Sequence, residues 1–159
     1  MTLTIFTGPR GDGKAHRTLQ ALVAALPPGS TGAIVTPEAV SRAWPGVVRV
    51  TGGAGHRSGR IDLPNGTTLH VLGPRSAFNL RRMRCAAVAM VGADKLSKDV
   101  ATWALAATRT GAHLFIATEP PQTERGEWVA RLVEAVRSGE VKGEIVECGA
   151  MPTAPREAE

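Results

Sequence analysis

Cysteine is scarce in this chain, and long apolar runs are missing. The two cysteines, Cys85 and Cys148, stand far apart without a C-x-x-C pair or a neighbouring histidine cluster, so neither a disulfide framework nor a zinc site is indicated. A membrane span needs roughly 20 apolar residues, and a signal peptide needs a basic segment followed by an apolar one. The sequence has neither. These absences argue against a secreted or membrane protein and predict a protein of the reducing cytoplasm.

Acidic residues are outnumbered by basic ones. Nineteen Lys and Arg against 14 Asp and Glu give a formal net charge of +5. This excess favours anionic partners such as nucleotides or nucleic acid, but many equally basic proteins bind neither. A length of 159 residues with 43% hydrophobic residues fits one globular domain. We expect that domain over residues 1–149, followed by a flexible tail over 150–159.

Short apolar runs alternate with amphipathic segments, which is typical of a mostly parallel sheet with helices on both faces. Five runs predict the strands of a central sheet: 3–7, 32–36, 86–92, 113–118 and 143–148. Helical spacing of apolar residues predicts helices near Gly13, after Gly92 and near Arg125. Alternating segments around Asn65-Gly66 predict an inserted β-hairpin, and 47–51 is a candidate edge strand. The expected fold class is α/β with a five-stranded central sheet.

The first predicted strand runs into the glycine-rich stretch "GPRGDGKA". Gly8, Gly13 and Lys14 match the phosphate-binding pattern G-x-x-x-x-G-K-[ST], but Ala15 replaces its hydroxyl residue. In such a loop, backbone N–H groups, the helix N-terminus and the lysine hold phosphates, while the hydroxyl ligates magnesium. The alternative is an ordinary glycine-rich turn. The expected nucleotide- or phosphate-binding residues are Gly8, Pro9, Arg10, Gly11, Asp12, Gly13, Lys14 and Ala15.

Taken together, the motifs resemble the ATPase domain of the large terminase subunit, the DNA-packaging motor of tailed bacteriophages. After the phosphate loop, "RIDLPNGTTLHVLG" is similar to the hairpin before the acidic motif of that family, and "NLRRMR" to the segment that follows it. "AAVAMVGADKLSKD" is similar to the strand that ordinarily ends in Asp-Glu-Ala, and "LFIATEPP" to the coupling motif. The likeness spans roughly residues 3–148.

That resemblance implies a P-loop NTPase fold with ATP as its cofactor. It also implies DNA and other phage packaging or virion proteins as partners, oligomerisation, and the host cytoplasm as location. Because the chain begins at the phosphate-loop strand and ends after the fifth predicted strand, we expect neither the family's upstream adenine-holding segment nor its nuclease domain.

The sequence departs from the family at the positions that bind magnesium and orient the attacking water. In the acidic motif, Val91 stands where the family has its magnesium-binding Asp, and Gly92 stands where it has its catalytic Glu. With Ala15, these substitutions remove both protein ligands of one magnesium ion, so the sequence offers little support for Mg²⁺ as a cofactor. Such losses lower hydrolysis by several orders of magnitude, each tenfold being ~1.4 kcal/mol. The expected protein is a degenerate ATPase, and whether any hydrolysis remains is left open.

An active DNA-packaging or DNA-remodelling ATPase would need displaced acids. Asp94 would serve if its strand ran two or three residues further, although a helix start with Asp94 or Ser97 near it favours capping. Glu119 follows Thr118 at the end of a central strand, where ligands collect in α/β sheets, although a solvent-facing loop position is the alternative. The candidate catalytic residues are Asp94, Thr118 and Glu119. A small P-loop kinase is a third hypothesis, but no arginine-rich lid or acceptor carboxylate is recognisable.

Arginine crowds into the hairpin region, where Asp62 is nearly the only carboxylate. Such a patch could contact DNA phosphates, or it could be a solvated face. No aromatic residues interleave it, which argues against a base-stacking single-strand binder. The candidate DNA contacts are Arg57, Arg60, Arg81, Arg82 and Arg84. The histidines show no metal-ligand spacing, so no metal site is expected.

Overall fold

The computed structural model describes residues 2–9, 13–37, 49–51, 58–120 and 124–148. The strands are β1 (Thr2–Thr7), β2 (Thr31–Val35), β3 (Arg49–Thr51), β4 (Ser58–Asp62), β5 (Thr68–Leu72), β6 (Cys85–Val91), β7 (Thr108–Thr118) and β8 (Glu144–Glu147). These eight strands form one sheet in the order β3-β4-β5-β2-β6-β7-β1-β8. From β5 to β8 in this order the strands are parallel, while β4 and β3 join antiparallel at the β5 edge. The predicted α/β class with a mostly parallel sheet is confirmed.

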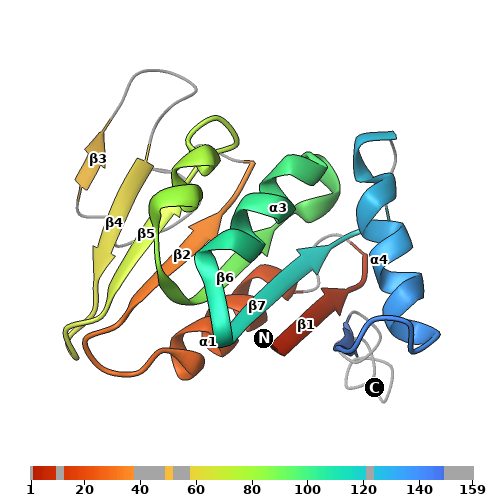
Figure 1. Cartoon of the computed structure of the whole chain (residues 1–159), viewed down its shortest axis with the longest axis horizontal. Coiled ribbons are helices and arrows are strands. Elements are labelled where there is room, and N and C mark those ends of the chain that lie inside the picture. The colour runs from red at the N-terminus through yellow and green to blue at the C-terminus, as the bar shows by residue number, and fades with distance from the viewer. Residues whose placement is uncertain (1, 10–12, 38–48, 52–57, 121–123, 149–159) are drawn as a thin grey trace, which may run out of the picture.

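Helices cover both faces of the sheet. The α-helices are α1 (Lys14–Ala25), α3 (Lys98–Ala107) and α4 (Glu127–Arg137), and the 3-10 helices are η1 (Ala77–Arg82), η2 (Ala93–Lys95) and η3 (Glu124–Gly126). Helix α1 lies on one face, and α3 and α4 lie on the other (Figure 1). In β6, Ala87 and Ala89 pack into the core under α1, while Val88 and Met90 pack into the core under α3 and α4. Because successive side chains of a strand point to opposite faces, one apolar run supplies both cores.

The sheet is larger than the five strands expected from the sequence. The predicted hairpin is present, and Asn65 accepts a hydrogen bond from the Thr67 amide at 3.0 Å within its turn. However, β5 also pairs in parallel with β2, so the hairpin belongs to the central sheet and is not an insertion beside it. Strand β3 then continues the sheet at β4. The five-strand count is wrong because strand periodicity reveals a buried face but not the neighbouring strand.

Because β1, β6 and β7 are parallel, their carboxyl ends lie together at one end of the strands. Strand β7 lies between the other two, with Thr118 beside Thr7 of β1 and Ala117 beside Val91 of β6. Residues that follow these three strands therefore lie close together, although they are far apart in the sequence. Crevices at the carboxyl ends of parallel strands are the usual ligand sites of open α/β sheets.

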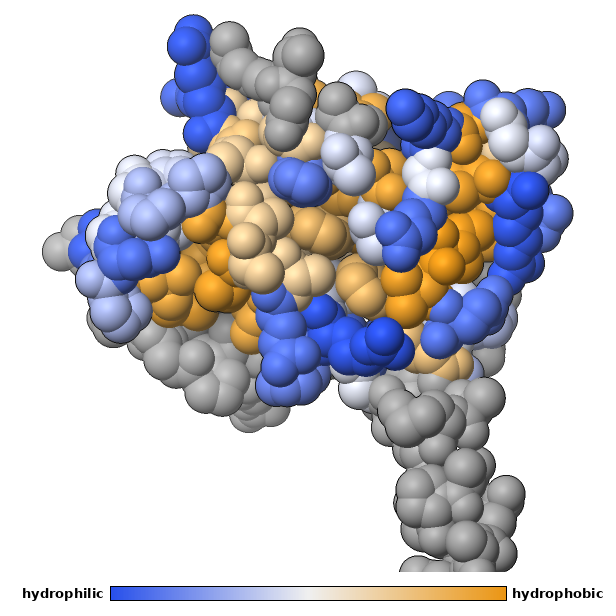
Figure 2. All heavy atoms as spheres, turned by 90° about the horizontal axis from the view of Figure 1, so that it is seen from below, coloured by the Kyte–Doolittle hydropathy of each residue, from blue (hydrophilic) through white to orange (hydrophobic). Residues whose placement is uncertain are grey.

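The surface at the amino ends of the parallel strands is partly apolar. Seen from that side, apolar residues gather near the centre and hydrophilic residues lie around them (Figure 2). None of the helices formed by the described residues is both long enough and apolar enough to cross a bilayer. The predicted tail over 150–159 lies outside the described residues.

Candidate functional site

The described part of the predicted phosphate loop connects β1 to α1 at the carboxyl edge. Gly13 is the N-cap residue of α1 and adopts a left-handed conformation with φ of 84°, which favours glycine. Lys14, the first helical residue, is only 8% exposed, and its Nζ donates a 2.7 Å hydrogen bond to the Pro9 carbonyl. The lysine therefore reaches back across the loop. Gly8, Pro9, Gly13, Lys14 and Ala15 come together here, whereas Arg10, Gly11 and Asp12 lie outside the described residues.

The phosphate-loop pattern places a hydroxyl residue directly after the lysine. Thr18, the next hydroxyl residue along α1, does not take over that role. Ala15 is exposed and carries no side-chain oxygen. The Thr18 side chain is fully buried, and its hydroxyl donates a 2.7 Å hydrogen bond to the Lys14 carbonyl one turn earlier. Such a bond to the backbone of the preceding turn is common for threonine inside helices. The Thr18 hydroxyl therefore serves α1 itself.

Val91 and Gly92 stand at the end of β6, where the terminase resemblance places two acids. Val91 packs against the core on the α1 face, so its apolar side chain lies on the same face of the sheet as α1. Gly92 has φ of +68°, and a Cβ atom there would lie 3.0 Å from Cγ and 3.1 Å from Cδ of Pro37. Left-handed backbone and this crowding both disfavour a side chain at position 92. Ala15, Val91 and Gly92 therefore supply no side-chain ligand for the magnesium ion that the terminase resemblance implies.

The three candidate catalytic residues come together at the ends of β6 and β7. Asp94 is buried, with an exposed fraction of 7%, and its Oδ1 accepts a 3.2 Å hydrogen bond from the Glu119 amide. The Thr118 hydroxyl donates to the Glu119 carbonyl at 2.9 Å. Asp94 therefore ties η2 to the end of β7. Of the two residues that the sequence placed near this helix start, Ser97 is the N-cap residue of α3, whereas Asp94 caps neither α3 nor η2, whose N-cap residue is Gly92.

Glu119 lines a cavity of about 390 Å³ between the carboxyl ends of β1 and β7 and helix α4. The described residues that line it are Thr7, Gly8, Pro9, Thr118, Glu119, Pro120, Val129, Ala130, Val133, Glu134, Arg137 and Glu147. Glu119 is half-buried there, in the loop that follows β7. Figure 1 shows α4 beside β1 at this end of the sheet. The sequence predicted α4 but contained no signal that this helix would form one wall of a cavity beside the predicted phosphate loop.

An ion-pair cluster joins α4 to β8 at the rim of this cavity. Arg137 lies 2.7 Å from a carboxylate oxygen of Glu147 and 3.4 Å from one of Glu134. The hydrogen bond to Glu147 is the largest of the effects that raise the pKa of Arg137. The Thr7 hydroxyl donates to the other Glu147 oxygen at 3.3 Å. The guanidinium is therefore shared between two carboxylates.

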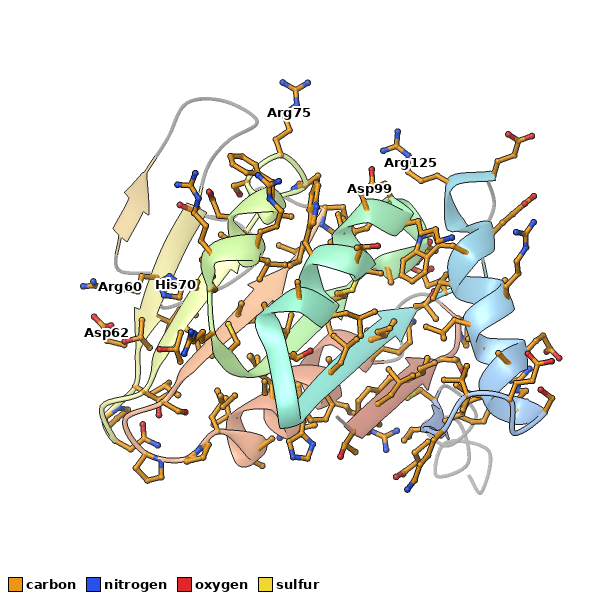
Figure 3. All side chains as sticks on the ribbon, viewed as in Figure 1. Arg60, Asp62, His70, Arg75, Asp99 and Arg125 are labelled. Atoms are coloured by element: carbon orange, nitrogen blue, oxygen red, sulfur yellow. The ribbon has the colours of Figure 1, made fainter. Side chains whose placement is uncertain are left out.

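The candidate DNA contacts are distributed over separate elements. Arg60 on β4 lies opposite His70 of β5, and its Nε is 3.2 Å from Oδ1 of Asp62 (Figure 3). Arg81 and Arg82 are exposed at the end of η1, and Arg84 is exposed just before β6. Arg57 lies outside the described residues. Burial, followed by the charge of Arg60, lowers the pKa of His70, while Asp62 acts in the opposite direction.

No protein-family model matches the sequence, and no curated protein matches it. Among solved structures, the large terminase of a thermophilic bacteriophage is similar, with a TM-score of 0.61 and 10% sequence identity. The fold is terminase-like. The match covers 99% of this chain and 44% of that terminase, so the chain spans less than half the length of this neighbour. At this identity the terminase-like description concerns the fold alone. Within the described residues of this fold, no group of three or more His, Cys, Asp or Glu side chains is placed to hold a metal ion.

Proposed function

We propose that this chain is a terminase-like P-loop phage protein that binds phosphate or nucleotide weakly and is a degenerate ATPase. The observation that carries this proposal is the end of β6, where Val91 presents an apolar side chain and Gly92 has a left-handed backbone crowded by Pro37. Hydrolysis in P-loop enzymes depends on a bridging magnesium ion and an oriented water. Neither position supplies a side-chain oxygen for these tasks.

Phosphate binding in this proposal rests on the N-terminal end of α1. The N-terminus of α1 and its backbone N–H groups favour an anion. Lys14 already lies across the loop on the Pro9 carbonyl, and its ammonium would move from that oxygen to a phosphate. Binding of this kind uses backbone donors and one lysine, so it does not require magnesium.

The proposed biological role is carried by contacts with other molecules. DNA and phage packaging or virion proteins are the partners in this proposal, and the host cytoplasm is the location. The exposed arginines at η1 and before β6 support an anionic partner. Arg60 supports it less, since Asp62 lies 3.2 Å away.

A second candidate function is an active DNA-packaging or DNA-remodelling motor domain that uses displaced acids. It is favoured by Glu119, which lines the same cavity as Gly8 and Pro9, and by Asp94, whose carboxylate contacts the Glu119 amide. In this alternative, one of these carboxylates would orient water beside the phosphates. Asp94 is less suited, because one of its oxygens already accepts a backbone hydrogen bond.

Titration calorimetry with ATP and a slowly hydrolysed analogue, with and without magnesium, tests the proposal alongside phosphate release from the same sample. We expect weak binding that magnesium does not strengthen, and no turnover. Lys14→Ala should abolish binding. Lys98→Ala is the matched control, because Lys98 is the first residue of α3 as Lys14 is of α1, and it should bind like the unchanged protein.

Acid variants separate the two candidate functions. Asp94→Asn keeps an oxygen for the Glu119 amide but removes the charge, and Glu119→Gln removes the other carboxylate. Magnesium-dependent turnover that disappears in Lys14→Ala and in one of these variants would overturn the degenerate ATPase in favour of the motor domain. Absence of any ATP binding would overturn the phosphate-binding part of the proposal.

A further inference from the structure

The surface of η1 combines an exposed aromatic ring with arginines. Side chains three residues apart lie in one row on a 3-10 helix. Ala77 and Leu80 form a fully buried row, which anchors η1 in the core. The next row carries Phe78, which is 37% exposed, and Arg81, which is also exposed. The prediction that no aromatic residue lies among the arginines of this region is therefore wrong.

Two contacts hold Arg81 beside the Phe78 ring. The Arg81 Nε donates a 3.2 Å hydrogen bond to the Phe78 carbonyl. The guanidinium carbon lies 5.8 Å from the centroid of the ring, within the range of a cation–π contact. Nucleic-acid bases stack on aromatic rings and on guanidinium planes alike. The pair therefore offers two flat, solvent-accessible groups in a defined position on a well-anchored helix.

The surroundings of this pair are strongly basic. Arg75, Arg82 and Arg84 are exposed like Arg81, and Figure 3 shows Arg75 pointing outward from the loop before η1. Residues 63–93 contain no Asp or Glu. Within the described part of the chain, none of these four arginines forms an ion pair with an acid. Their charge is therefore available to an anionic partner.

Helix α3, which packs against η1, does not cancel this charge. Its charged residues are Lys98 and Asp99, both exposed, so that it adds no net charge. Arg60 and Asp62 on β4 form an ion pair of their own. The excess positive charge of this side of the molecule therefore belongs to η1 and to the residues directly before and after it.

Single-stranded nucleic acid matches both the charge and the ring. Proteins that bind single strands combine basic side chains along the phosphate backbone with aromatic side chains on which the bases stack. A duplex keeps its bases stacked inside, and an acidic protein has none, so either partner would use the arginines but leave the ring without a base. We propose that η1 binds single-stranded DNA or RNA through one surface, the η1 patch: Arg75, Phe78, Arg81, Arg82 and Arg84.

The dimensions of η1 set the number of nucleotides involved. Its six residues rise about 2.0 Å each, which gives a length of roughly 12 Å. Phosphates of one strand are about 3.4 Å apart along a helical axis, so the η1 patch spans about three of them. This inference deepens the DNA contact within the proposed function and rests on that part of it. It requires neither phosphate nor nucleotide at the N-terminus of α1.

Fluorescence anisotropy of the full chain at low salt tests the preference for single strands. The labelled probes are oligo-dT and oligo-rU of about 12 nucleotides, a typical site size, and a mixed-sequence duplex of the same length. We expect at least one single strand to bind about tenfold more tightly than the duplex, the scale of one stacked base. Oligo-dT and oligo-rU distinguish DNA from RNA as the source of the strand. Unlabelled polyglutamate, which carries charge without bases, should compete poorly.

Variants of Phe78 test the stacking. Phe78→Ala should weaken binding of the preferred single strand about tenfold and leave duplex binding unchanged, while Phe78→Trp should restore single-strand binding. Val23→Ala is the matched control. Val23 is 38% exposed, close to the exposure of Phe78, but lies on α1 at the other face of the sheet. Circular dichroism checks the fold of each variant, and the comparison of single strand with duplex needs no variant at all.

A variant of Arg82 tests the phosphate contacts. Arg82→Ala should weaken binding of every single-stranded probe and reduce the slope of log affinity against log salt by about 0.7. Arg131→Ala is the matched control, because Arg131 is an exposed arginine on α4, and it should leave both affinity and slope unchanged.

The ways in which this inference can fail are distinguishable. Duplex binding as tight as single-strand binding would overturn the single-strand site and leave the proposed DNA contact in place. Strong competition by polyglutamate, with Phe78→Ala binding normally, would overturn it in favour of recognition of charge alone. If no nucleic acid binds, this inference and the DNA contact of the proposed function both fail, while titration with ATP still reports on phosphate binding at α1.

Discussion

At the scale of single residues, the backbone conformation of Gly92 and the position of Pro37 explain why glycine is favoured at position 92. Its left-handed conformation turns the chain from β6 into η2, and Pro37 occupies the space into which a side chain would extend. An acidic side chain at this position would therefore have to strain the backbone and displace Pro37. The glycine at position 92 and the local backbone conformation are consistent with each other.

We predict that Gly92→Ala lowers the free energy of unfolding by about 1–3 kcal/mol, the usual cost of a strained backbone position. Gly29→Ala is the matched control. Gly29 also has a positive φ, of +76°, but nothing lies within 4 Å of a Cβ atom there. Chemical denaturation of both variants should show the larger loss for Gly92→Ala, because only that variant adds crowding to backbone strain. Equal losses would mean that Pro37 moves aside freely.

The contact that Asp94 makes in the structure differs from the roles that its sequence position suggested. Its sequence position suggested either a displaced catalytic acid or a helix cap, and the structure places its carboxylate on the Glu119 amide. Nothing in the spacing of 25 residues between them signals this contact. It arises because β6 and β7 are neighbours in the sheet.

At the scale of elements, the β4–β5 hairpin holds a histidine, His70, whose pKa is lowered by its position in the strand pair. His70 of β5 lies opposite Arg60 in the strand pair, and burial and this positive charge lower the pKa of His70 in the folded protein. The unfolded chain, with an ordinary pKa near 6.5, then takes up a proton at a higher pH than the folded chain. Stability linked to His70 is fully present above about pH 6.5 and is lost as pH falls from there toward the lowered pKa.

We therefore predict that acidification from about pH 7.5 to about pH 5 destabilises the unchanged protein more than the His70→Gln variant. Denaturation at several pH values measures the difference, because the carboxylates contribute equally to both proteins. Asp62→Asn provides a second comparison. It removes the one charge that raises the pKa of His70, so the acid loss should extend to lower pH. Identical pH profiles for the unchanged protein and His70→Gln would contradict the prediction.

At the scale of the whole molecule, the strands differ in how completely they are enclosed. β6 is paired on both sides, by β2 and β7, and its residues contribute to the cores on both faces. β8 pairs only with β1 among the described strands and is less buried. Local opening should therefore cost much more free energy at β6 than at β8.

Hydrogen exchange followed by mass spectrometry tests this difference. We expect backbone amides of β6 and β7 to exchange about tenfold or more slowly than those of β8 and β3, because edge strands open without disrupting the cores. Peptides from α1 should exchange at intermediate rates. Protection of β8 equal to that of β6 would indicate that an additional contact covers the β8 edge.

The sequence by itself determined most of the strand and helix segments, the position of the glycine-rich stretch before Lys14, and the absence of side-chain oxygens from Ala15, Val91 and Gly92. These features are local: a hydrophobic period, a glycine before a lysine, and the identities of Ala15, Val91 and Gly92 are all read within a few residues. Only the tertiary structure decided that the hairpin joins β2, that Asp94 holds the end of β7, and that α4 closes a cavity beside Pro9. Each of these depends on which distant segments become neighbours, and that choice is made by packing of the whole sheet.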